Sequence, residues 1–261
     1  MPLPFRATAS LTATTREIIN RKLAAGGSIG TQHRRAIDFF VRQTQAAGLF
    51  SKLSRCSLFS GDDLTSALVP EINTLGNATD TNNNFVSGDY NPMVGLTGNG
   101  SSKYLTMGIN NIQLSQNNVH LSAYVTSLVA PATWQGLIGT TNDTTASLQL
   151  YIDAVTPTPS ARIFNLVQLT NSNQLVGLRI GNRISASSFS NYVKTTVASA
   201  ASASSAPTST IAISVFGRGT AQFYSGSLGG YTLGSGLTPS EANQFSDIWD
   251  ATMAMMGRPT T

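Results

Sequence analysis

The sequence predicts a mainly β protein, a sandwich of two sheets with helices near both ends of the chain. Only 11% of the 261 residues are charged, and Ser, Thr, Asn and Gly are abundant, as expected where many turns join neutral strands. Residues 119–126 alternate between apolar and polar side chains, the period of a strand with one buried face. Strand-like segments recur about every dozen residues between turn clusters, which is typical of a sandwich or barrel.

Residues 1–30 are predicted to form an N-terminal arm with one short helix. Residues 1–13 contain two prolines and show no periodicity, so they are expected to be extended. Thr14 and Glu17 fit a capping box, a short apolar stripe follows, and two glycines at 26–27 end the helix. Because so short a helix is not stable alone, we expect its stripe to pack either on the body of this chain or on another subunit, with another subunit favoured.

Residues 31–64 are predicted to form a helical segment that leads into the sandwich. Thr31 can cap a helix that Gly48 ends, with one shared apolar face made of Ile37, Phe40, Val41 and Thr44. The pair Asp62 and Asp63 indicates a turn or a helix start. A metal site at this pair would need further oxygen ligands nearby.

Residues 65–261 are predicted to form the sandwich together with a C-terminal helix. The Ser/Ala-rich stretch 198–210 is expected to be a long loop between strands. Thr238, Pro239 and Glu241 form a strong helix start, and the helix should pack on the sandwich through its apolar face. We expect strands at 67–69, 84–86, 103–107, 119–126, 134–139, 146–153, 162–169, 175–180, 184–193 and 211–216.

The stretch 95–127 carries a family resemblance. Its order G-x-G-S-x-x-Y-L, then S-Q-N-x-x-H-L-S-A-Y-V, resembles the opening strands of concanavalin A-like jelly-roll sandwiches, of laminin-G or pentraxin type, in structural proteins of tailed bacteriophages and prophages. Residues 36–63 and 237–258 resemble the helical segments that flank those sandwiches. The resemblance implies a virion structural protein, in a tail fibre or baseplate or as a capsid decoration, that assembles as an oligomer, with a trimer favoured.

The charges are unevenly distributed along the chain. Up to Arg55 there are nine basic and two acidic residues, a net charge of +7, whereas the remainder has seven basic and ten acidic residues, a net charge of −3. A basic N-terminal segment suggests docking to an acidic partner, which could be a protein surface such as that of another virion protein, an anionic glycan or, less expected, nucleic acid. A merely solvated helix face is the alternative. The docking residues would be Arg16, Arg21, Lys22, Arg34 and Arg35.

Cys56 is the single cysteine, so no intramolecular disulfide can form, and its apolar surroundings indicate a small buried side chain. No apolar run is long enough to span a membrane, and the first thirty residues lack the apolar core of a signal peptide. We therefore expect synthesis in the host cytoplasm and release within the virion.

The sequence predicts no enzymatic activity. Sandwich glycoside hydrolases carry acids clustered as E-x-D-x-E, whereas Asp153 stands alone on its strand, so a glycan hydrolase is the weaker alternative. Only His33 and His120 are present, which rules out a zinc site built on several histidines. His120 is expected on the polar face of its strand; a Ser/His/Asp triad around it stays open, although no G-x-S-x-G elbow is present.

Binding of host-surface glycans is the main alternative to a purely structural role. It would need an aromatic platform, for which the candidates are Tyr124, Trp134, Tyr151 and Tyr192. Each of these rings can equally be a core or cross-strand residue. No cofactor is expected; Ca²⁺ is the alternative, with Asp89, Asn142 and Asp143 in loops as its candidate ligands.

Overall fold

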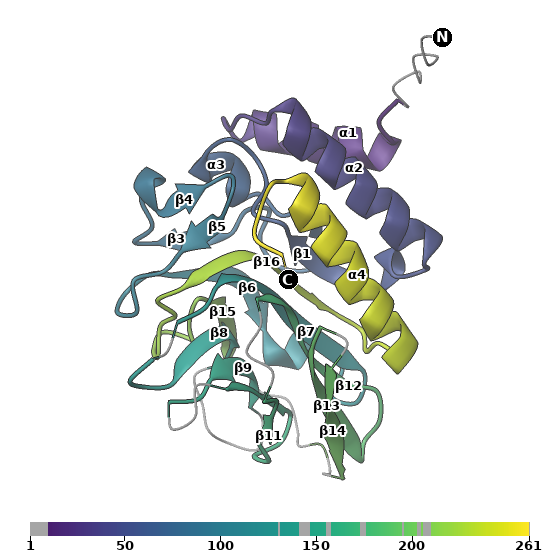
Figure 1. Ribbon diagram of the computed structural model, residues 1–261, viewed down its shortest axis with the longest axis vertical. Coiled ribbons are helices and arrows are strands. Elements are labelled where there is room, and N and C mark those ends of the chain that lie inside the picture. Colours follow the sequence, from purple (N-terminus) through teal and green to yellow (C-terminus); the bar gives the residue numbers. More distant parts are fainter. Residues whose placement is uncertain are drawn as a thin grey trace.

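The computed structural model describes residues 10–129, 131–140, 147–154, 158–172, 176–194, 196–202, 205 and 210–260 (Figure 1). Two antiparallel sheets lie face to face, and helices cover the outer face of one of them. The predicted β-sandwich with N-terminal helices and a C-terminal helix is confirmed. None of the helices in this part of the chain is long and apolar enough to cross a membrane.

The first sheet has nine strands. Its main path runs β14-β13-β12-β7-β16-β1-β2, and β5 and β4 attach beside β16. The bounds are β1 Leu53–Ser57, β2 Ile72–Asn73, β4 Tyr90–Asn91, β5 Gly95–Thr97, β7 Val119–Ser127, β12 Gly177–Arg183, β13 Ser188–Val193, β14 Thr196–Ser202 and β16 Ser227–Gly234.

The second sheet has seven strands in the order β11-β10-β9-β8-β15-β6-β3. Its apolar side chains and those of the first sheet form the core between the sheets. The bounds are β3 Thr81–Asn83, β6 Tyr104–Asn110, β8 Gln135–Gly139, β9 Leu148–Ile152, β10 Pro159–Ile163, β11 Leu169–Thr170 and β15 Ala212–Val215.

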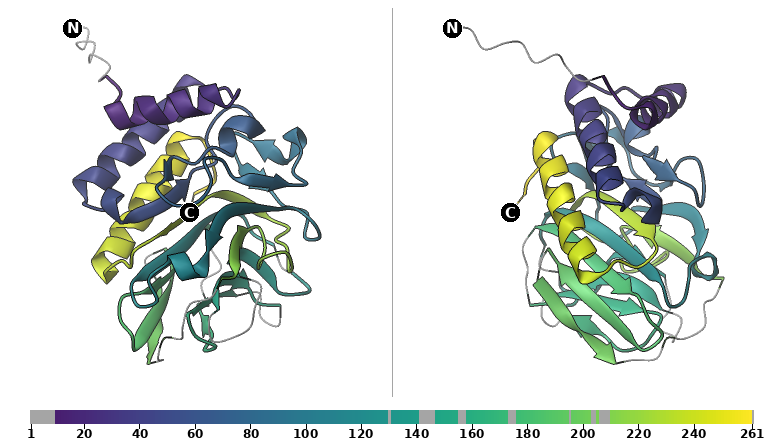
Figure 2. Two further views of the ribbon diagram at one scale, coloured as in Figure 1. Left: turned by 180° about the vertical axis from the view of Figure 1, so that it is seen from behind. Right: turned by 90° about the vertical axis from the view of Figure 1, so that its right-hand side faces the viewer.

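The helices form a third layer on the nine-stranded sheet (Figure 2). α2 and α4 lie side by side, and a second apolar core joins them to the sheet. α1 crosses α2 at the far end of this layer. The bounds are α1 Ala13–Ala24, α2 Thr31–Ala46, α3 Leu64–Ala67 and α4 Pro239–Met255, with short 3₁₀ helices η1 Phe50–Lys52, η2 Ser87–Asp89 and η3 Asn111–Gln113.

The predicted C-terminal helix is confirmed: it begins where expected, and its apolar face packs on the sandwich. Thr238 caps α4 by accepting from the Glu241 backbone N–H, and the Glu241 carboxylate accepts in return from the Thr238 N–H. Trp249 is fully buried, with its ring 5.8 Å from Tyr124 on β7 and 5.7 Å from Phe40 on α2. This one side chain therefore joins the sheet to both helices.

β16 lies at the centre of the nine-stranded sheet, yet the sequence pattern did not predict it. Its glycines explain why the pattern is missing. A Cβ on Gly229 would lie 2.9 Å from the Met253 sulfur, and one on Gly230 would lie 2.8 Å from the Trp249 ring. Glycine therefore lets α4 lie close to the strand, but it also removes the apolar alternation by which strands are recognised.

Several segments differ from their predicted form. Residues 67–69, predicted as a strand, follow or end the short helix α3, which Asp63 caps. Part of the predicted loop 198–210 belongs to β14. β1 lies within the expected helical lead-in segment, and it pairs with both β16 and β2.

The first helix also differs from expectation. Its cap is Thr12 rather than Thr14, because the Thr12 side chain accepts from the Thr15 N–H. Ile18 and Ile19 are buried in the core that α1 shares with α2. These two residues of the apolar stripe thus pack within this chain, the alternative to packing on another subunit.

Replacing Trp249 with Ala should lower the free energy of unfolding by about 3–5 kcal/mol, because the cavity would lie where three elements meet. Met255→Ala is the matched control: the residue lies on the same helix but is 37% exposed, so its effect should stay within about 0.5 kcal/mol. Urea unfolding followed by circular dichroism measures both. Equal effects would show that α4 is not held through Trp249.

Candidate functional site

The outer face of the seven-stranded sheet brings together two of the predicted platform residues. Along β9, Leu148, Leu150 and Ile152 enter the core between the sheets, so Tyr151 points to the opposite face. Trp134, just before β8, stacks on it with ring centroids 5.4 Å apart and planes at 28°. Trp134 is partly exposed and Tyr151 is buried beneath it.

Two arginines flank this aromatic pair. The Arg162 guanidinium lies 5.5 Å from the Trp134 ring centroid and 5.9 Å from that of Tyr151. The Arg218 guanidinium lies 5.5 Å and 5.2 Å from the same two rings. Cations over aromatic faces are attracted by the ring quadrupole, so the four side chains hold one another in place. We call them the aromatic–arginine cluster.

The sequence interpretation did not include these arginines. Arg162 could have been found, because it alternates on β10 with Ala161 and Ile163, both of which lie in the core. Arg218 follows β15 in a turn, and it reaches the cluster only because Gly136 has no side chain: a Cβ there would lie 2.5 Å from the arginine Cγ. No local sequence signal indicates this contact.

Polar side chains continue the same face towards β11. Gln168 is partly exposed, and its amide nitrogen donates to Asp153 Oδ2 at 2.7 Å, Ser160 Oγ at 3.1 Å and Thr170 Oγ1 at 3.2 Å. This edge of the cluster therefore offers amide, hydroxyl and carboxylate groups beside an aromatic ring. Such a combination suits a ligand with both hydroxyl groups and an apolar face.

The other two platform candidates lie elsewhere. Tyr124 is buried under α4, where it stacks on Trp249 and donates to Asp250 Oδ1 at 2.6 Å. Tyr192 is 4% exposed and belongs to the same helix-facing core. Both rings point away from the solvent because helices cover the outer face of their sheet.

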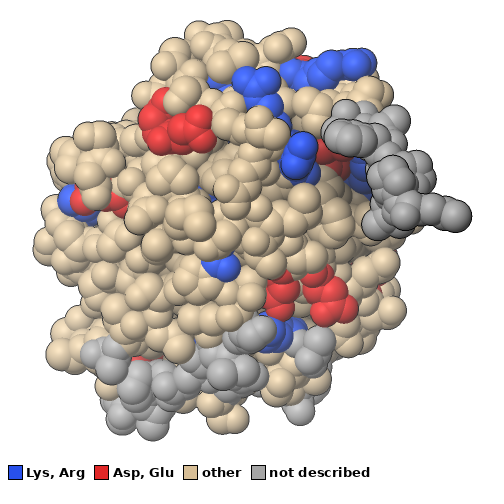
Figure 3. Space-filling model, turned by 45° about the horizontal axis from the view of Figure 1, so that its top comes forward, with Lys and Arg blue, Asp and Glu red and all other residues tan. Residues whose placement is uncertain are grey.

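The predicted docking residues divide into two groups. Arg16 and Arg35 are exposed on the helices, where Figure 3 shows basic side chains spread over the helical end of the molecule. Arg34 is partly exposed and donates to Ile29 O. Arg21 and Lys22 instead bind other segments of this chain and so connect α1 to them.

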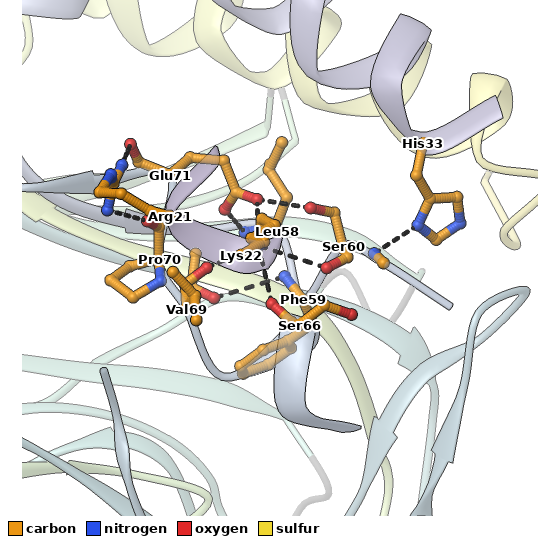
Figure 4. A network of polar contacts seen from close by, with 12 residues as sticks. Arg21, Lys22, His33, Leu58, Phe59, Ser60, Ser66, Val69, Pro70 and Glu71 are labelled. Carbon is orange, nitrogen blue, oxygen red and sulfur yellow. Dashed lines mark hydrogen bonds and ion pairs between the residues drawn. The ribbon is translucent and has the colours of Figure 1, made fainter. Parts of the chain in front are cut away.

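Lys22 is fully buried, so its charge is not presented to a partner. It forms an ion pair with Glu71 Oε1 at 2.9 Å and donates to the carbonyls of Ser60, Ser66 and Val69 (Figure 4). Burial lowers its pKa, and the carboxylate of Glu71 opposes this shift. Arg21 donates to Pro70 O at 3.0 Å and to Glu71 O at 2.7 Å. α1 is thereby fixed to the segment before β2.

Both histidines are buried. His33 Nδ1 accepts from the Gly61 N–H at 2.7 Å. His120 was expected on a polar, surface face, but that face lies under α4, next to Phe245. Its Nδ1 lies 2.6 Å from Ser235 O and its Nε2 lies 3.1 Å from Thr232 Oγ1, so these two partners are a carbonyl and a hydroxyl rather than the carboxylate of a catalytic triad.

The calcium candidates are not brought together in the described chain. Asp89 pairs with Lys103 at 2.5 Å and accepts from the Val86 N–H. Asn142 and Asp143 lie outside the described residues. Within the described ranges no three His, Cys, Asp or Glu side chains gather as metal ligands.

No protein-family model matches the chain, and no curated protein matches its sequence. Solved structures are similar to it in fold. Domain 4 of a GH43 extracellular arabinanase from Geobacillus stearothermophilus, in complex with arabinotriose, has a TM-score of 0.53 at 10% identity and covers 75% of this chain and 98% of that domain. Trypanosoma rangeli sialidase in complex with sialic acid has a TM-score of 0.50 at 15% identity, covering 76% and 33%. The botulinum neurotoxin serotype D binding domain has a TM-score of 0.49 at 11% identity, covering 74% and 50%.

The arabinanase domain and the sialidase share a β-sandwich fold with this chain. These similarities also correct the expectation that the chain is not an enzyme. That expectation is wrong because the same fold forms part of an arabinanase and of a sialidase. The chain spans only about a third of the sialidase and half of the neurotoxin domain.

The buried histidines predict a loss of stability in mild acid. Burial lowers the pKa of each from 6.5 to about 4, and the Arg258 charge adds to the effect at His33. The unfolded chain therefore binds more protons as the pH falls through this range, and each histidine should remove roughly 3 kcal/mol of unfolding free energy by pH 4.

Urea unfolding between pH 7.5 and 5 measures this effect, since ordinary carboxyl groups titrate mainly below that window. His33→Gln and His120→Gln should each flatten the pH dependence. Unchanged stability across the window in the parent protein would contradict burial of the neutral rings.

Proposed function

We propose that this chain is a carbohydrate-binding β-sandwich module that binds glycans on the outer face of the seven-stranded sheet. The observation that carries the proposal is the aromatic–arginine cluster, in which a partly exposed Trp134 is backed by Tyr151 and flanked by Arg162 and Arg218. The apolar face of a sugar ring packs on Trp134, while Arg162 supplies hydrogen-bond donors and the side-chain carbonyl oxygen of Gln168 supplies an acceptor at its edge. Sites of this kind combine an aromatic surface with a few fixed polar groups.

The similar structures support the same reading. The arabinanase domain was solved with arabinotriose and the sialidase with sialic acid, so saccharides bind proteins that contain this fold. The opposite sheet offers no equivalent surface in the described chain, because α2 and α4 cover it. The glycan's identity follows from screening, with host-surface glycans as the first set.

Trp134→Ala should weaken glycan binding at least tenfold, about 1.4 kcal/mol, because the ring supplies the stacking surface. Phe39→Ala is the matched control, a partly exposed aromatic residue on α2 at the other side of the molecule; it should bind as the parent does. A glycan array followed by calorimetry measures affinity, and chromatography of the incubated glycan shows whether cleavage follows binding. Equal affinity of both variants, or no glycan bound by the parent, would overturn the proposal.

We further propose that the module is displayed on the particle of a tailed bacteriophage, in the tail fibre or baseplate or on the capsid. The support is the resemblance of its opening strands and flanking helices to virion proteins of this kind, together with exposed Arg16 and Arg35 on the helical layer. This location agrees with the cluster on the sheet opposite the helices.

A cryo-EM map of the particle whose genome encodes the chain tests this location. The helical layer should contact a neighbouring virion protein, and the seven-stranded sheet should face outwards. Absence of the chain from purified particles, by mass spectrometry, would refute a virion role and leave the glycan proposal standing.

A further inference from the structure

A groove of about 290 Å³ lies between α1 and the edge of the nine-stranded sheet. Apolar side chains of Ile18, Phe50 and Ile72 line it, and the exposed Glu17 stands at its rim. The remaining lining residues are Thr14, Arg21, Glu71, Asn73 and Thr74. Its walls are rigid, because Arg21 binds the backbone of Pro70 and Glu71, and Glu71 is paired with the buried Lys22 (Figure 4).

The sheet side of this groove is the edge strand β2, beside which Arg21 binds the Glu71 carbonyl and the Asn73 side chain. β2 is the last strand of the main path and pairs with β1 alone, through Cys56↔Ile72 and Arg55↔Asn73. Only alternate residues of an antiparallel pair exchange backbone bonds, so one of these two residues presents its N–H and C=O to the outer edge. In the described chain no strand lies beyond it. A strand edge can accept an added extended segment. Because β2 is only two residues long, few backbone hydrogen bonds form there, and apolar contacts in the groove supply the rest of the affinity.

The chain itself contains a segment that fits this edge. In the sequence Pro2-Leu3-Pro4-Phe5-Arg6, Leu3 and Phe5 would share one face of an extended strand, suited to the apolar lining. Their N–H groups would share one edge, while the two prolines, which lack an N–H, would occupy the other, as edge strands tolerate. Arg6 is complementary in charge to Glu17.

We propose that the groove binds residues 2–6 of a second copy of this chain by strand addition to β2, so that arm exchange joins the subunits. The entry of the chain into α1 favours a second copy over the chain's own arm. Ser10 O accepts from Arg42, and the Thr12 N–H donates to Asp38, both on α2. The arm therefore reaches α1 on the α2 side, whereas the groove faces the side that carries Thr14, Glu17 and Arg21.

Mixing two single-cysteine variants of the full chain tests the proposal directly. Phe5→Cys mixed with Thr74→Cys should give a disulfide-linked dimer containing one of each, seen on a non-reducing gel. Phe5→Cys mixed with Gln45→Cys, an exposed α2 position, is the matched control and should give none. The native Cys56 is buried with a raised thiol pKa, so its background reaction is low.

Sedimentation of charged variants provides the second measurement. Leu3→Asp/Phe5→Asp should raise the dissociation constant of the oligomer at least tenfold, whereas Ala7→Asp on the same arm should not. The absence of the mixed dimer, or equal sedimentation of the double variant and the parent, overturns the proposal, as does an intrachain link in a Phe5→Cys/Thr74→Cys variant without any interchain product. The test is independent of glycan binding.

Discussion

Buried cations that bind backbone carbonyls hold the helical layer to the sandwich. Arg258, just beyond α4, donates to Leu58 O at 2.7 Å, Phe59 O at 2.6 Å and Gly229 O at 2.8 Å. Lys22 on α1 reaches the carbonyls further along the same segment and pairs with Glu71. A buried charge without partners costs several kcal/mol, so these cations require segment 58–71 to keep its irregular path. Both the position of α1 and the groove beside β2 depend on this arrangement.

Sequence signals predicted those elements whose structure depends on residues close together in the chain. The start of α4 was predictable because a cap, a proline and a capping-box acid act within one helical turn. The face of α2 was predictable from its spacing. β16 was not predictable, because glycine is required there by the close approach of Trp249 and Met253, which are distant in sequence. These contacts leave no apolar–polar alternation in the strand itself.

The alternation in residues 119–126 was correctly assigned to a strand, but the prediction that its polar face is exposed to solvent was wrong. A period of two indicates only that the two faces differ. On β7 the apolar face meets the other sheet and the polar face meets the helices, so His120 and Tyr124 are both buried. Of the candidate site, the sequence indicated Trp134 and Tyr151 only as separate aromatic candidates. Their stacking depends on the pairing of β8 with β9, in which Gly136 lies opposite Tyr151. Arg218, which contacts both rings, lies in a turn far along the chain.

The asymmetry of the two sheets determines where a ligand can bind. The nine-stranded sheet uses its outer face to hold α2 and α4, and its aromatic side chains there serve the second core. The seven-stranded sheet carries polar and aromatic side chains on its outer face, and two arginines hold rings on that face rather than within the sheet-to-sheet core. The helical layer lies on the other side of the molecule (Figure 2). This layer carries the exposed arginines, and the groove lies beside α1. The proposed subunit contact and the proposed glycan site therefore lie at opposite ends of the molecule, so neither contact would obstruct the other.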